Sequence, residues 1–83
     1  MLNVREVKAR GGFRLWLRFN DGAEGEVDLR EHLTGLVFEP LRDPVVFATV
    51  QVDPEIRTIA WPNGADFAPE FLHGLLNSGV AAV

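Results

Sequence analysis

The chain has 83 residues, of which 47% are hydrophobic and 24% charged, and it has a net charge of −4 and no cysteine. This size and composition fit one small globular domain, and the lack of cysteine excludes disulfides, thiolate metal sites and thiol nucleophiles. No apolar run approaches the roughly 18 residues of a membrane span, and no signal peptide is recognisable. We therefore expect a cytoplasmic protein that does not enter a membrane, with one domain over residues 1–77 and a flexible tail over 78–83.

Charge is unevenly distributed along the chain. Residues 1–18 carry five basic side chains and one acid, whereas residues 19–83 carry three basic side chains and eleven acids. A basic end can indicate nucleic-acid binding. The alternative is that strands from the two ends neutralise each other in one sheet, and we favour it because an acidic chain repels phosphate. The basic residues concerned are Arg5, Lys8, Arg10, Arg14 and Arg18.

Two strands are expected before residue 20, separated by Gly11-Gly12. Residues 13–19 alternate between apolar and polar positions, which predicts a strand with one buried face. Its expected inner side chains are Phe13, Leu15, Leu17 and Phe19. Residues 3–9 alternate more weakly, with Val4, Glu6 and Lys8 expected on one side and Arg5, Val7 and Ala9 on the other.

Asn20-Asp21-Gly22 is expected to form a hairpin turn, and the pattern around it fixes the register. A two-residue loop would place Phe19 opposite Glu24, so that an apolar side chain would share a face with an acid. A three-residue loop places Arg18 opposite Glu24 and makes both faces consistent. This loop needs a left-handed residue at its end, and we expect Gly22 there. The other expected pairs are Leu17 with Gly25, Trp16 with Glu26, Leu15 with Val27 and Arg14 with Asp28.

The rest of the chain predicts short helical turns, a second hairpin and a final helix. Asp28 and Glu31 fit a capping box, and Asp43-Pro44 fits an N-cap followed by proline. Strands are expected over residues 49–53 and 57–61, and an amphipathic helix from about Pro69 to before Gly79. Its apolar stripe is Phe71, Leu72, Leu75 and Leu76.

These elements together predict an α+β fold: a three-stranded antiparallel meander, a short helical crossover, a second hairpin and a C-terminal amphipathic helix. The helix is expected to cover one apolar face of the sheets. That face comprises Leu15, Leu17, Phe19, Val27, Val50, Val52, Ile59 and Trp61.

The segment Trp61-Pro62-Asn63-Gly64-Ala65-Asp66 concentrates special backbone chemistry and is the candidate structural or functional turn, together with Glu70. Asp66 and Glu70 are spaced so that they could share a proton or a divalent cation. We favour a structural interpretation, in which Asp66 caps the helix and Glu70 favours the positive end of its dipole. The two histidines, His32 and His73, lack the spacing of metal ligands. No catalytic, cofactor-binding or metal residue is therefore assigned.

Trp16 lies between Arg14 and Arg18 on the outer side of its predicted strand. This composition is typical of a hot spot in a protein interface, and the three residues form our candidate interface. The alternative is that an arginine side chain or part of the crossover covers the indole ring.

Several segments, in their order and spacing, resemble a small bacterial family, the domain of unknown function 2442. They are Val27-Asp28-Leu29, Val37-Phe38-Glu39-Pro40-Leu41-Arg42-Asp43, Phe47, the segment from Trp61 to Asp66, Pro69-Glu70 and Leu72. The resemblance implies a compact α+β fold and no established activity. It also implies that some members carry a helix-turn-helix domain after this one, which we do not expect within these 83 residues, and that others sit beside a small protein in a toxin–antitoxin-like pair.

We expect a non-catalytic protein-interaction or regulatory module without a cofactor. A homodimer or a small protein partner is expected, because so small a domain buries only roughly 60% of its chain surface. One alternative is a ligand-binding or enzymatic domain around Asn63, Asp66 and Glu70. The other is nucleic-acid binding through the basic N-terminal strands, which we consider the weaker.

Overall fold

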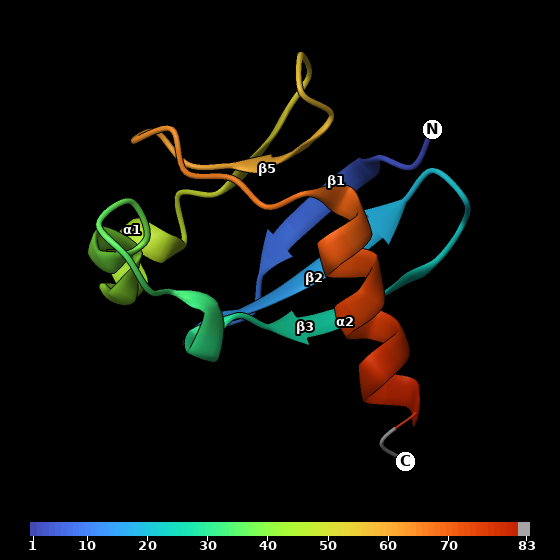
Figure 1. The fold of residues 1–83 in the computed structure, drawn as a ribbon, viewed down its shortest axis with the longest axis horizontal. Coiled ribbons are helices and arrows are strands. Elements are labelled where there is room, and N and C mark those ends of the chain that lie inside the picture. The colour runs from blue at the N-terminus through green and yellow to red at the C-terminus, as the bar shows by residue number, and fades with distance from the viewer. Residues whose placement is uncertain (82–83) are drawn as a thin grey trace.

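Two antiparallel sheets and a C-terminal helix surround one core (Figure 1). The computed structural model describes the backbone of residues 1–81 and the side chains of residues 1–76. The elements are β1 (Val4–Ala9), β2 (Arg14–Phe19), β3 (Glu24–Asp28), the 3₁₀ turns η1 (Arg30–His32) and η2 (Glu39–Arg42), α1 (Pro44–Phe47), β4 (Gln51–Asp53), β5 (Thr58–Ala60) and α2 (Pro69–Ala81). Strands β1, β2 and β3 form a meander and β4 pairs with β5, so the expected α+β architecture is confirmed.

The predicted register of the β2–β3 hairpin is confirmed at every pair. Arg18 lies opposite Glu24, and the ladder continues to Arg14 opposite Asp28. Gly22 has a φ of +89°, as the three-residue loop requires. The alternation of apolar and polar side chains was therefore sufficient to fix this register.

Strand β1 departs from simple alternation at its first residues. Val4 lies opposite Phe19 and Glu6 lies opposite Arg18, so two steps along β1 match one step along β2. This bulge turns Val4 to the inner face, where it is 2% exposed. The expectation that Val4 shares a side with Glu6 is wrong, because the extra residue Arg5 shifts the two-residue period.

The crossover between β3 and β4 contains one of the expected caps in full and the other in part. Asp28 Oδ1 accepts a hydrogen bond from the backbone N of Arg30 at 2.9 Å. Asp28 therefore bonds the first amide of η1, but no return bond from Glu31 is found among the described side chains, so the expected capping box is incomplete. The second cap is confirmed, since Asp43 Oδ1 accepts from Val45 N at 2.9 Å.

Strands β4 and β5 are shorter than expected. The amides of Thr49 and Val50 donate to carbonyls of α1 at 3.1 and 3.3 Å, so β4 begins only after them. Arg57 has a φ of +58° in the turn before β5, and Trp61 N donates to the carbonyl of Ala65. Residues at the ends of both predicted strands therefore form hydrogen bonds within turns and do not pair as strands.

Helix α2 crosses the inner face of the meander (Figure 1). Leu72 is fully buried, Leu75 and Leu76 are half-buried, and Phe71 is 39% exposed. The expected inner face is buried throughout except for Val52, which is half-buried. No helix in the described part of the chain is long and apolar enough to cross a membrane.

The helix also continues past Gly79 to Ala81, which corrects its expected end. A glycine costs about 1 kcal/mol inside a helix and does not by itself stop one. The flexibility of the tail over 78–83 stays a prediction, and residues 82 and 83 lie outside the described residues.

Candidate functional site

The segment from Trp61 to Asp66 is a tight hairpin turn. Gly64 N donates to the Trp61 carbonyl at 3.0 Å, Trp61 N donates to the Ala65 carbonyl at 2.9 Å, and Gly64 has a φ of +89°. The loop before β3 has the same hydrogen-bond pattern, with Gly22 in the place of Gly64. Both are three-residue hairpin loops that end on a left-handed glycine. The chain therefore turns back along β5 before it enters α2.

Side chains of this turn hold the crossover in place. Asn63 Nδ2 donates to the Val37 carbonyl at 2.9 Å, while Asn63 Oδ1 accepts from Ala65 N at 3.1 Å. Trp61 is 4% exposed, and its Nε1 donates to the Phe47 carbonyl at 2.8 Å. The polar groups of Asn63 and Trp61 thus bond to backbone, which supports the structural interpretation of the turn.

Asp66 does not lie at the N-cap of α2. It forms an isolated bridge with Ala60, and α2 begins three residues later at Pro69. The capping role expected for Asp66 is therefore wrong, because the turn is followed by a stretch paired with β5 and not directly by the helix. Glu70 lies in the first turn of α2, as expected. Both carboxylates are exposed, and neither has an ion-pair partner within the described side chains.

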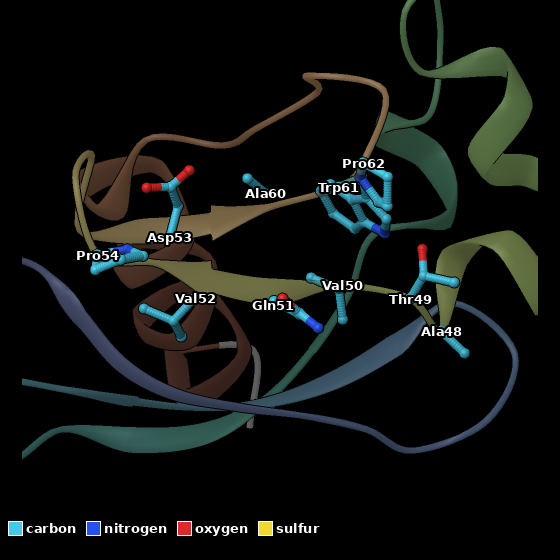
Figure 2. A pocket seen from close by; sticks show the side chains of 10 residues that line it. All are labelled: Ala48, Thr49, Val50, Gln51, Val52, Asp53, Pro54, Ala60, Trp61 and Pro62. Carbon is cyan, nitrogen blue, oxygen red and sulfur yellow. The ribbon is translucent and has the colours of Figure 1, made fainter.

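A groove of about 660 Å³ follows β4 and reaches the first two residues of this turn, Trp61 and Pro62. Figure 2 shows Asp53 and Pro54 at one end of its lining and Ala48 and Thr49 at the other. Asp53 is its one ionisable lining residue, and Asn63, Asp66 and Glu70 do not line it. The described residues also contain no group of three or more His, Asp or Glu placed to hold a metal ion. The polar side chains of this lining are Thr49, Gln51 and Asp53, which Figure 2 shows spread along its length.

The candidate interface lies on the other side of the molecule from α2, on what we call the outer face of the meander. The residues of this face form three columns, one on each strand. They are Glu6 and Lys8 on β1, Arg14, Trp16 and Arg18 on β2, and Glu24, Glu26 and Asp28 on β3. A basic and aromatic column therefore lies beside a column that is entirely acidic.

Trp16 is half-buried at the centre of this face. The Nζ atom of Lys8 lies 5.3 Å from the centroid of its ring, a cation–π distance. Arg14 forms an ion pair with Glu26 at 3.4 Å, and Arg18 forms one with Glu6. The covering cation is thus the lysine of the neighbouring strand, and Trp16 remains partly exposed.

The sequence predicted Arg14, Trp16 and Arg18 as the interface. Their β1 neighbour Lys8 was predicted only for the nucleic-acid alternative, and Glu6 was not assigned to either surface. The signal for these two was weak, because the bulge interrupts the alternation of β1. Once β1 pairs with β2, both lie directly beside the predicted residues.

The two histidines contact aromatic rings and not each other. His32 packs edge-on against Phe71, and His73 against Phe19, each with centroids 5.0 Å apart. His73 Nε2 lies 2.9 Å from Asp21 Oδ2, which joins α2 to the β2–β3 loop. The pKa of Asp21 is lowered, first by the backbone N–H of Ala23 and further by His73. The His73–Asp21 contact therefore has a structural explanation.

Comparisons with known proteins agree on the fold. A crystal structure of a candidate DNA-binding protein, NE0471 from Nitrosomonas europaea ATCC 19718, is similar with a TM-score of 0.83 at 21% sequence identity. The alignment covers 98% of this chain and 52% of that one, so this chain spans about half the length of the neighbour. A comparison with curated proteins finds no match. The family model described as "Protein of unknown function (DUF2442)" matches residues 4–76, and the chain belongs to this family.

Proposed function

We propose that this domain is a non-catalytic protein-interaction module that binds its partner through the outer face of the meander. The observation that carries the proposal is the half-buried Trp16 at the centre of a strand face whose other side chains are charged. A tryptophan flanked by arginines is the composition that dominates binding energy in protein interfaces. Within this proposal the domain works in the cytoplasm, because a chain without cysteine has no disulfide that the reducing environment could break.

Charge supports a protein partner over nucleic acid. The outer face carries three basic side chains, Lys8, Arg14 and Arg18, against four acids. Phosphate binding depends on unopposed positive charge, and the acidic column of β3 lies within one strand spacing of both arginines. The neighbour's description as a candidate DNA-binding protein still makes DNA the second candidate. Salt-dependent retention on DNA that Arg14→Ala weakens would favour it over a protein partner.

The test compares tagged wild type with Trp16→Ala in lysate and in purified form. We expect wild type either to retain a host protein in lysate or to self-associate in purified form at high concentration. Trp16→Ala is expected to lose that association while its circular dichroism stays unchanged. Leu36→Ala is the matched control, because Leu36 is a large apolar side chain that is 89% exposed in the crossover. If both variants lose the partner equally, or if Trp16→Ala keeps it, the outer face is not the binding surface.

A further inference from the structure

The arrangement of charge on the outer face selects one kind of partner and one geometry, and this inference rests on the proposed function. Along β2 the column reads Arg18, Trp16, Arg14, and along β3 the residues directly opposite are Glu24, Glu26 and Asp28. The face is thus basic and aromatic in one column and acidic in the next, at the same heights along the strands. A surface with both charge signs in adjacent columns can be complementary to itself.

Two-fold symmetry leaves few ways to place two such faces against each other. An axis that is parallel to the plane of the sheet but perpendicular to the strands keeps each column opposite the same column of the other copy. With the axis centred on Trp16, Arg18 would face the partner subunit's Arg14, and acids would face acids. An axis parallel to the strands and centred on β2 also places the arginines of the two copies together. Like charges held opposite each other destabilise an interface, so both arrangements are unfavourable.

An axis parallel to the strands that runs between β2 and β3 gives the opposite result. Each β2 column then faces the partner subunit's β3 column at the same height. Arg18 lies opposite the partner subunit's Glu24, and Arg14 lies opposite the partner subunit's Asp28. Because the operation is two-fold, each of these contacts occurs twice. Trp16 lies opposite the partner subunit's Glu26 in this arrangement, and the two Trp16 side chains lie beside the axis at the centre of the contact.

We propose that the partner is a second copy of this chain, packed face to face about a two-fold axis that runs parallel to the strands between β2 and β3. The ion pairs formed within one copy do not use every charged side chain of the outer face, so some remain available for contact with a second copy. Glu24 has no ion-pair partner within the described side chains, although it lies directly opposite Arg18 on the neighbouring strand. The ion pairs of Arg14 and Arg18 are themselves exposed, with side-chain exposures of 54% and 47%. Aligned packing of two sheets is also a common arrangement.

The expected dimer is weak. The overlap comprises two strands from each copy, spaced about 4.8 Å apart and roughly 17 Å long, and it buries far less than the ~1,200–2,000 Å² of a standard interface. We expect a dissociation constant of roughly 0.1–1 mM at low salt. Because exposed ion pairs contribute, association weakens as salt is raised, whereas a purely apolar contact would not weaken.

Charge reversal measured by sedimentation equilibrium tests the axis. Arg18→Glu is expected to weaken self-association by roughly tenfold, because two attractive contacts become repulsive. Adding Glu24→Arg to the same chain is expected to restore it, since the exchanged charges again face each other. Arg42→Glu is the matched control, because it makes the same charge change at an exposed position of η2. Circular dichroism reports whether each variant folds.

Every other outcome overturns the inference. Stronger association of Arg18→Glu would indicate the perpendicular axis, in which that change relieves a repulsion. Failure of Glu24→Arg to rescue would indicate that β2 faces another column. A wild type that stays monomeric up to about 2 mM excludes the dimer. That last result leaves the proposed function standing if Trp16→Ala still loses a host protein that wild type retains.

Cross-linking provides a second and independent measurement, because the chain contains no cysteine. A mixture of Arg18→Cys and Glu24→Cys chains is expected to form a heterodimer with a short bis-maleimide. A mixture of Arg18→Cys and Arg14→Cys is expected to react far less, since the proposed axis separates these positions along the strand. A reversed preference contradicts the axis even if charge reversal alters the fold.

Discussion

Trp61→Phe tests whether the turn between β5 and α2 holds the domain together. The indole of Trp61 packs against the rings of Phe47 and Phe67, with centroids 5.5 and 5.9 Å away. Its Nε1 also donates to the Phe47 carbonyl, which accepts a second bond from Val50 N at 3.3 Å. Phenylalanine keeps an aromatic ring at this position but removes the donor and part of the buried volume.

The expected cost is about 2–3 kcal/mol. The lost hydrogen bond contributes about 1 kcal/mol and not the full penalty of an orphaned carbonyl, because Val50 N still donates to it. The smaller ring adds roughly 1–2 kcal/mol through lost burial and the space left behind. A domain of this length has a total stability of roughly 4–12 kcal/mol, so the loss is a large fraction. At about 4–8 °C per kcal/mol, the melting temperature falls by roughly 10–20 °C.

The assay is urea unfolding followed by far-ultraviolet circular dichroism. The slope of the unfolding free energy against urea concentration is compared between variants to check two-state behaviour. Trp16→Phe is the matched control, because it makes the same substitution at the other tryptophan of the chain. Trp16 makes no buried hydrogen bond within the described side chains and is only half-buried, so its replacement is expected to change stability by less than about 0.5 kcal/mol. Equal stabilities of the two variants would show that the packing and hydrogen bond of Trp61 do not support the fold as argued.

Gly22→Val is expected to destabilise the domain by about 1–2 kcal/mol in the same assay, because a β-branched residue resists the φ of +89°; an unchanged midpoint would mean that the loop adapts. Asp43→Ala is expected to cost about 1 kcal/mol through loss of the N-cap of α1, and a change below about 0.3 kcal/mol would argue against that cap. Asp21 is stabilised in its charged form by Ala23 N–H and by His73, so its pKa is lower in the folded state than its ordinary 3.8. That stabilisation is present above pH 3.8 and is lost as pH falls through the lowered pKa. Asp21→Asn should therefore reduce how steeply the free energy of unfolding falls as the pH is lowered in the acid range. An unchanged pH dependence would contradict this assignment.

The sequence by itself determined the local pairings of this domain. The alternation around residues 13–28 fixed the β2–β3 register and the place of Gly22, because a shift of one residue would exchange the buried and exposed faces. The chemistry of Asp43-Pro44 likewise fixed the start of α1. The same alternation placed Arg14, Trp16 and Arg18 on the outer face. These features depend on interactions between neighbours along the chain or across one hairpin.

The tertiary structure decided the features that depend on contacts between elements distant in the sequence. The bulge at the start of β1 brings Val4 into the core, a choice that depends on its contact with β2. Asp66 pairs with Ala60 beside β5 and does not cap α2. The residues of the preceding turn are compatible with either a hairpin or the entry into a helix, so the sequence alone did not distinguish the two. The contacts of Lys8 with Trp16 and of Glu6 with Arg18 depend on the pairing of β1 with β2. Burial and long-range pairing selected among alternatives that were locally equivalent, and so they decided which side chains share a surface.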